Sequence, residues 1–293
     1  MYSLSKTTSG SQKGRKMMEE SEKLSVSYHD LFDYPLTFSD LIKWNTSKKI
    51  SANNRKIQVV CQNNYYFLKG REGLIYKRLL TARNSDKKLK IAKNASRVLS
   101  VIPSVKMVAV TGSLAMNNSS DESDIDLMII TKNRTLWITR LLSYFVLRTM
   151  HYVLRSPTDR NQKNKLCLNM WMDENNLIWR SPRNIYTAHE IAQIMPLVNK
   201  NKTYEKFLYK NRWILKFWPN SVRAIKPPRD KVTEKYNFLL FVISFVENIA
   251  YKIQYLYMRK KITRELVTPT RAIFHPHDWG NVIISRLNNN GIF

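Results

Sequence analysis

The spacing of hydrophobic and polar residues predicts a mixture of short strands and longer helices. Two β-prone apolar runs, residues 105–112 (VKMVAVTG) and 124–131 (DIDLMIIT), are followed by a third at 165–172. A polar turn, DENN, then leads to LIW at 177–179, which we expect to pair with the third run as a hairpin. Between the second and third runs, residues 133–155 have helical spacing over roughly twenty positions.

The N-terminal part reads as a small module of its own. In residues 26–70 the pattern predicts a helix, a turn at Pro35 and a second helix, which Thr37 can cap with Asp40 three residues later. Two β-prone runs around a Gln-Asn-Asn turn follow, and this order resembles a winged helix-turn-helix. Such modules read DNA in some proteins and serve as interaction modules in others.

The remaining segments are mostly helical in character. Residues 71–104 predict one or two helices that lead to Pro103, and Thr187 with Glu190 has the spacing of a capping box. A proline-bearing linker at 219–230 precedes a long apolar helix at about 235–261. We therefore predict an α+β fold with a small mixed β-sheet. Its expected parts are a disordered tail (1–23), a winged-helix-like module (24–70), a core that contains the three strands (71–182) and a helical C-terminal region (183–293).

Charge is the unusual feature of the composition. The chain has 49 Lys and Arg against 22 Asp and Glu, a net charge of +27. Such a field attracts polyanions, although a general lysine preference gives the same composition. Two cysteines, Cys61 and Cys167, suggest neither a disulfide framework nor a zinc site, and a reducing cytoplasm is expected. The polar first 23 residues do not have the pattern of a secretory signal.

Two long apolar segments raise the question of a membrane. The segment at 137–154 contains Arg140 and Arg148, and the one at 236–258 contains Glu247 and Lys252. Charges at a bilayer centre are unfavourable, so we expect buried amphipathic helices and no integral membrane span. Association with a membrane surface stays as a third hypothesis.

The stretch TGSLAMNNSSDESDIDLMII, residues 111–130, carries the candidate chemistry. In a strand, Asp124 and Asp126 lie on one face, and two adjacent carboxylates repel each other unless a cation lies between them. Hard oxygen ligands favour Mg²⁺ or Mn²⁺. Gly112 and Ser113, which end the preceding strand, can bring backbone N–H groups and a hydroxyl close to phosphate oxygens. Asp121 and Glu122 are expected to be solvated loop residues.

This pattern of Gly-Ser, about ten residues and Asp-x-Asp resembles the signature of the polymerase-β-like nucleotidyltransferases, and minimal bacterial nucleotidyltransferases look closest. The resemblance implies that Asp124 and Asp126 hold divalent metal ions and are catalytic, with Gly112 and Ser113 binding the nucleotide. It also implies a third carboxylate on a later strand. There Asn169 cannot act as a base, and Asp173 is the candidate.

Several further residues have both a functional and a structural explanation. Lys132 and Arg140 are candidates for phosphate contact, and Arg140 begins a basic helical stripe whose alternative is a solvated face. That stripe continues through Tyr144, Arg148, His151 and Arg155. The residues His275 and His277 beside Asp278 suggest a metal site or an ordered turn. His189 and Glu190 could be acid–base residues, but the capping box already explains Glu190. The aromatic and basic stretch at 204–218 suits either RNA binding or core packing.

These observations predict an enzyme, a metal-dependent nucleotidyltransferase. It would use Mg²⁺ or Mn²⁺ to transfer a nucleoside monophosphate from a nucleoside triphosphate, such as ATP, to an acceptor hydroxyl, and the positive charge favours RNA or another anionic acceptor. The alternative is a nucleic-acid-binding or regulatory protein on a catalytically degenerate scaffold of the same kind.

Overall fold

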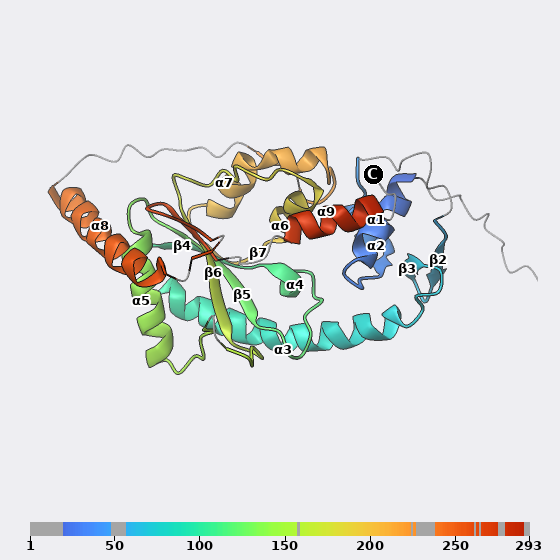
Figure 1. The fold of residues 1–293 in the computed structure, drawn as a ribbon, viewed down its shortest axis with the longest axis horizontal. Coiled ribbons are helices and arrows are strands. Elements are labelled where there is room, and N and C mark those ends of the chain that lie inside the picture. The colour runs from blue at the N-terminus through green and yellow to red at the C-terminus, as the bar shows by residue number, and fades with distance from the viewer. Residues whose placement is uncertain are drawn as a thin grey trace, which may run out of the picture.

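The computed structural model describes residues 20–47, 57–156, 159–223, 225–226, 238–260, 262–263, 265–274 and 279–289, and it confirms the predicted α+β class. Its elements form an elongated molecule, with a small N-terminal module at one end and a larger six-stranded sheet towards the other (Figure 1).

The N-terminal module has the predicted order of two helices and a hairpin. It consists of α1 (Glu20–Asp30), β1 (Leu36–Thr37), α2 (Phe38–Lys43), β2 (Val59–Gln62) and β3 (Tyr65–Leu68). Thr37 and Asp40 form the predicted capping box of α2. Asn63 and Asn64 lie in the left-handed region, with φ of 50° and 65°, and this backbone makes the tight turn between β2 and β3. The strand β1 adds an antiparallel partner to β3.

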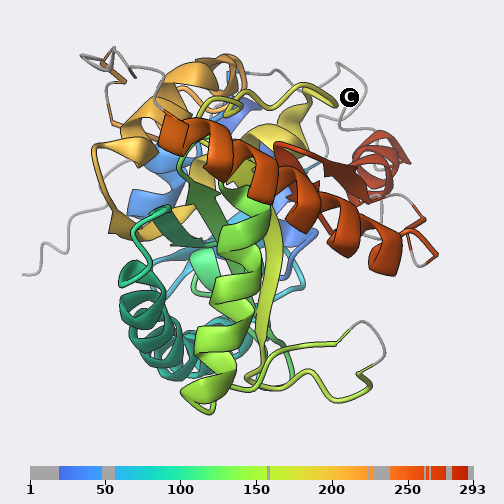
Figure 2. The ribbon, with the colours of Figure 1, turned by 90° about the vertical axis from the view of Figure 1, so that its left-hand side faces the viewer.

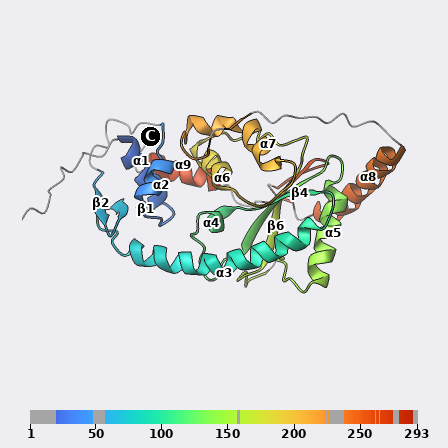
Figure 3. The ribbon, with the colours of Figure 1, turned by 180° about the vertical axis from the view of Figure 1, so that it is seen from behind.

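A single helix, α3 (Leu74–Ser100), connects this module to the main sheet. It runs along one side of the molecule, from the β2–β3 hairpin to the start of β4 (Figure 3). Its C-terminal half packs Ala92, Ala95 and Leu99 against the sheet. The helix therefore fixes the distance between the two parts of the chain.

The main sheet contains the three predicted strands, β4 (Val105–Val110), β5 (Ile125–Thr131) and β6 (Leu166–Asp173). The strand order is β7-β4-β5-β6-β9-β8, in which β5 and β6 are parallel and the other neighbours are antiparallel. The strands β7 (Met195–Asn199), β8 (Leu266–Thr268) and β9 (Arg271–Ile273) come from the region that we expected to be helical. The predicted hairpin of 165–172 with 177–179 is wrong, because β9 pairs with β6 instead.

Both faces of the sheet are covered, so successive strand residues enter two different cores. On one face α3, α5 (Leu136–Thr149) and α8 (Phe238–Met258) cover Val108, Ile125 and Leu127. On the other face lie α6 (Ile185–Gln193), α7 (Thr203–Lys210), the 3-10 helix η2 (Arg212–Lys216), α9 (Trp279–Asn289) and the N-terminal module. The period-two alternation places Asp126 on this second face, beside Met128.

Two predicted helix boundaries are wrong. The helix α5 ends at Thr149, where the prediction extended it to Arg155, and the chain turns at His151 with a φ of 59°. Leu154 then forms a parallel bridge with Leu166. The helix α6 begins one turn earlier than expected, because the Asn184 side chain caps it by accepting from the N–H of Thr187 at 2.8 Å.

None of the helices among the described residues has the length and apolar content needed to cross a membrane.

Candidate functional site

The antiparallel pairing of β4 with β5 brings the Gly-Ser and Asp-x-Asp parts of the predicted motif together. Gly112 begins the short helix α4 (Gly112–Ala115) just after β4, and Asp126 is the second residue of β5. The N–H of Thr111 donates to the carbonyl of Asp126 at 3.1 Å. A Cβ atom placed on Gly112 would lie 3.1 Å from Asp126 Oδ2. Only a glycine leaves this space next to the carboxylate.

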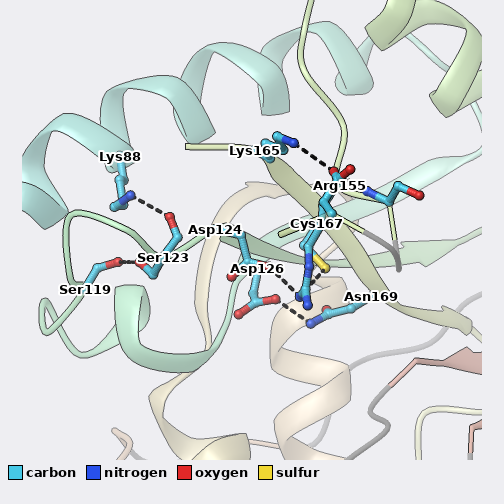
Figure 4. Close-up of polar contacts among 11 residues, drawn as sticks. Lys88, Ser119, Ser123, Asp124, Asp126, Arg155, Lys165, Cys167 and Asn169 are labelled. Atoms are coloured by element: carbon cyan, nitrogen blue, oxygen red, sulfur yellow. Dashed lines mark hydrogen bonds and ion pairs between the residues drawn. The ribbon is translucent and has the colours of Figure 1, made fainter. Parts of the chain in front are cut away.

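The loop that leads into β5 is held by a buried lysine. Lys88 of α3 is 1% exposed, and its Nζ donates to the carbonyl of Asp121 at 3.0 Å. The same Nζ donates to the carbonyl of Ser123 at 2.7 Å (Figure 4). It also donates to Asn164 Oδ1 at 2.9 Å. Three acceptors satisfy the three donors of the ammonium group, so the lysine stabilises the loop and fixes the position of Asp124 that follows it.

Asp124 and Asp126 have different partners. Asp124 Oδ2 forms an ion pair with Arg155 Nη1 at 2.6 Å, and the same nitrogen lies 3.6 Å from Cys167 Sγ (Figure 4). Asp126 Oδ1 accepts from Asn169 Nδ2 at 2.6 Å. The arginine therefore neutralises the outer carboxylate, while the inner carboxylate is bonded to a neutral amide.

Burial and nearby negative charge raise the pKa values of Asp126 and Cys167. Burial and the neighbouring Asp124 raise the pKa of Asp126 to about 7, and Arg155 opposes that shift. Burial, with the two carboxylates nearby, also raises the pKa of the Cys167 thiol far above its usual range. Cys167 is therefore a neutral thiol at physiological pH, and the negative charge of the site comes from oxygen atoms.

A cavity of about 520 Å³ opens in front of the carboxylates. Its walls come from α1, the turn after β4, the strands β5 and β6, and α6. Glu190 and Gln193 of α6 also line it, and Gln193 Nε2 donates to Glu190 Oε1 at 2.8 Å. Burial, followed by the charge of Asp126, raises the pKa of Glu190 to about 7. A third carboxylate thus faces the same cavity from a helix.

Two buried histidines form the wall between the module and the core. His29 of α1 and His189 of α6 approach each other at 3.1 Å between their Nε2 atoms. His29 Nδ1 lies 2.8 Å from the carbonyl of Ser25, which can only accept, so Nδ1 carries the hydrogen. His189 Nε2 consequently donates to His29 Nε2. Burial lowers the pKa of both rings, so they are neutral.

Asp173 is not part of this site, which corrects its predicted role as the third acid. The β5–β6 register aligns Asp126 with Cys167 and Thr131 with Asp173, so Asp173 lies at the far end of β6, about 20 Å from Asp126 along the strands. A bulge between these positions also turns Asp173 to the opposite face. Its carboxylate accepts from the N–H groups of Arg134 and Asn175, at 2.7 and 2.8 Å.

The predicted phosphate contacts Lys132 and Arg140 also lie away from the carboxylates. Lys132 follows the far end of β5, where its N–H donates to the carbonyl of Ser104 at 2.7 Å. Arg140 is enclosed between α5 and α8, donates to Gln254 Oε1 at 2.6 Å and stacks on Tyr144. Neither residue lines the cavity. Arg155 is the residue of the predicted basic stripe that reaches the site.

Of the remaining candidates, some lie outside the described residues and others have structural roles. His275, His277 and Asp278 lie outside the described residues. The aromatic stretch at 204–218 contributes Phe207 and Trp218 to the core, which agrees with the packing explanation.

Sequence reasoning missed the roles of Lys88 and Glu190. Lys88 stands among several lysines of α3, and the pattern contains no signal that separates it from the others. Glu190 was assigned to a cap, whereas its spacing of three from Gln193 on an apolar helix was the available signal of a paired, inward-facing carboxylate.

The donor atoms of the site fit a hard divalent cation. Asp124, Asp126 and Cys167 each offer an atom within 4.8 Å of the others, but the protonated thiol is a poor ligand for such an ion. Asn169 Oδ1 is buried and has no hydrogen-bond partner among the described residues. An unpartnered buried oxygen beside two carboxylates matches the ligand type that Mg²⁺ and Mn²⁺ prefer.

In comparisons with known proteins, the sequence matches neither a family model nor a curated protein.

Proposed function

We propose that this chain is a metal-dependent nucleotidyltransferase, which transfers a nucleoside monophosphate from a nucleoside triphosphate to an acceptor hydroxyl. The observation that supports it most is the convergence of Gly112, Asp124 and Asp126 at one end of the β4–β5 pair, in front of a cavity of about 520 Å³. That volume suits a small-molecule ligand such as a nucleotide. The sequence resemblance to polymerase-β-like nucleotidyltransferases agrees with this arrangement.

Asp124 and Asp126 would hold Mg²⁺ or Mn²⁺, with Asn169 Oδ1 as a further oxygen ligand after rotation of its amide. When bound, the cation would neutralise phosphate charge and polarise the phosphorus centre. Gly112 allows the backbone to approach the phosphates, and Ser113 lies exposed at the cavity wall. Arg155 can keep one oxygen of Asp124 while the other oxygen faces the cation.

Glu190 is the candidate that replaces Asp173 as the third carboxylate. It lines the cavity from α6, as Asp126 does from β5, and one of its oxygens is bonded to Gln193. The second oxygen would accept the proton of the attacking hydroxyl, as the oxygen–phosphorus bond forms and pyrophosphate leaves. A carboxylate with a raised pKa in a half-buried site suits this role.

The proposal is tested first by nucleotide binding, which requires no acceptor. We expect ATP or GTP to bind with Mn²⁺, and Asp126→Asn to weaken this affinity at least about tenfold because a charged ligand is lost. Asp121→Asn is the matched control, since Asp121 lies in the same loop and is exposed, paired with Lys163. Equal affinities of the two variants, or binding that ignores the divalent ion, would contradict the metal site.

Transfer is measured next with α-labelled triphosphates and RNA acceptors. The wild type should label an acceptor, whereas Asp124→Asn and Asp126→Asn should not, and Glu190→Gln should slow transfer with little change in nucleotide affinity. The catalytic proposal fails if the Asp124 and Asp126 variants transfer as much label as the wild type.

A second candidate function is a nucleic-acid-binding or regulatory protein on the same scaffold without catalysis. Asn169 in the strand next to Asp126, together with the Arg155 ion pair on Asp124, favours it, because both arrangements stabilise the carboxylates without a metal ion. Strong, salt-dependent RNA binding with no metal-dependent nucleotide binding would identify this alternative.

A further inference from the structure

The helices α5 and α8 present a large apolar surface outside the candidate site. They pack against each other at one end of the molecule and face outwards together (Figure 2). We define the α5–α8 face as the following exposed apolar residues, a subset of those on the two helices: Leu141, Leu142, Phe145, Val242, Phe245, Val246, Ile249, Ile253, Leu256 and Tyr257. Contiguous exposed apolar surfaces of this kind mark interaction sites.

Packing of the two helices with each other does not explain this face. Contacts between them use the opposite side of α8, where Glu247 binds backbone N–H groups of α5 and Gln254 bonds Trp137 and Arg140. The exposed residues of α8 recur at a spacing of three and four, so they form one continuous stripe. Phe245 and Ile253 are each 61% exposed, and Tyr257 is 74% exposed.

The exposed charged residues of these two helices are cationic. Arg148, Lys252, Arg259 and Lys260 are exposed on or directly after the two helices. Glu247 is the one acidic residue in the sequences of α5 and α8, and it is buried at 5% exposure. The α5–α8 face therefore combines large apolar side chains with positive charge that no exposed acidic residue of the two helices offsets, on a chain with a net charge of +27.

From this combination we propose that the α5–α8 face binds the surface of an anionic lipid bilayer, with α8 lying in the plane of the interface. An apolar stripe enters the boundary between headgroups and acyl chains, and flanking Lys and Arg side chains bind anionic headgroups. A second copy of the chain fits less well, because two cationic faces repel each other. Nucleic acid also fits less well, because its bases bind aromatic rings by stacking, whereas most side chains of the α5–α8 face are aliphatic.

The test is co-sedimentation of the full chain with lipid vesicles. We expect binding to vesicles that contain phosphatidylcholine and phosphatidylglycerol, at least about tenfold weaker binding to phosphatidylcholine alone, and weaker binding at high salt. Phe245→Asp with Ile253→Asp should reduce binding at least about tenfold, because two exposed apolar groups are replaced by anions. Lys252→Glu with Arg259→Glu should reduce it as well.

Tyr76→Asp is the matched control for Tyr257→Asp, because Tyr76 of α3 has the same exposed fraction of 74%. The single Tyr257 variant should weaken vesicle binding, and the Tyr76 variant should not. Unfolding temperatures of all variants establish that they are folded. If the Phe245→Asp/Ile253→Asp double variant does not fold, the single variant Tyr257→Asp tests the proposal. Absent binding to anionic vesicles, equal effects of the two tyrosine variants, or dimers by light scattering that Phe245→Asp disrupts would each overturn the proposal.

Discussion

At position 112, both the backbone conformation and the neighbouring Asp126 carboxylate disfavour any side chain. The φ of +62° at Gly112 lies in the left-handed region, and a Cβ atom there would be 3.1 Å from Asp126 Oδ2. Gly73, by contrast, has ordinary helical angles, and a Cβ atom on it would meet nothing within 4 Å. The two glycines therefore form a natural pair for comparison.

We predict that Gly112→Ala lowers the free energy of unfolding by about 1–2 kcal/mol and weakens Mn²⁺ binding, because the methyl group strains the backbone and displaces Asp126. Gly73→Ala should instead leave stability unchanged or raise it by up to about 1 kcal/mol. Urea unfolding and Mn²⁺ titration measure both effects. Similar results for the two variants would contradict the close approach at Gly112.

Arg155 shows why the sequence pattern did not predict every residue of the site. The sequence pattern located Asp124 and Asp126 because strand alternation places two residues at i and i+2 on one face. Arg155 reaches Asp124 only because α5 ends early and the chain returns alongside β6. That return depends on contacts between distant segments, which a local pattern does not contain.

At the level of elements, the N-terminus of α5 is capped by a residue of another helix, α8. The N-cap residue of α5, Thr135, makes no side-chain capping bond. Glu247 of α8 accepts instead from the N–H groups of Trp137 at 2.7 Å and Ile138 at 3.0 Å. A carboxylate at a helix N-terminus satisfies unpaired donors and interacts favourably with the helix dipole.

We predict that Glu247→Gln lowers the free energy of unfolding by about 1–2 kcal/mol, because the amide offers one acceptor to two buried N–H groups and brings an N–H of its own. Glu72→Gln is the control, since Glu72 is exposed and accepts one bond from the N–H of Gly70 at 3.2 Å. Its change should stay below about 0.5 kcal/mol. Chemical denaturation compares them, and equal losses would exclude the capping role.

On the scale of the whole molecule, the histidine pair joins the N-terminal module to the core. His29 lies on α1 and His189 on α6, and Trp44 and Trp218 surround them. Protonation of His29 at Nε2 would place two N–H donors against each other in a buried environment. Module and core are therefore held together best when both rings are neutral.

Burial lowers the pKa of His29 from 6.5 to about 4 in the folded protein. Above pH 6.5 both states keep the ring neutral; between 6.5 and about 4 only the unfolded chain binds the proton, so stability falls as pH falls. The raised pKa values of Asp126 and Glu190 act in the opposite direction over the same window. In a comparison of the wild type with a His29 variant, the contributions of Asp126 and Glu190 to the pH dependence cancel.

We predict that the stability difference between the wild type and His29→Phe shrinks by about 2 kcal/mol between pH 7.5 and pH 5, at about 1.4 kcal/mol per pH unit below 6.5. Urea unfolding at several pH values measures it. His151→Asn is the control, because His151 is exposed and asparagine tolerates its positive φ. A His29→Phe difference that stays constant with pH would contradict the buried neutral pair.

The sequence by itself determined the strands β4, β5 and β6, the order of elements in the N-terminal module and the position of Asp124 and Asp126. Each of these depends on local periodicity, turn residues or capping spacing within a few positions. The tertiary structure decided that β9 pairs with β6, that Asp173 lies away from the cavity and that Arg155 contacts Asp124. It also decided that Glu190 is the third carboxylate at the cavity. These features depend on strand register, a bulge and helix packing, which bring together residues that are far apart in the chain and that no local pattern relates.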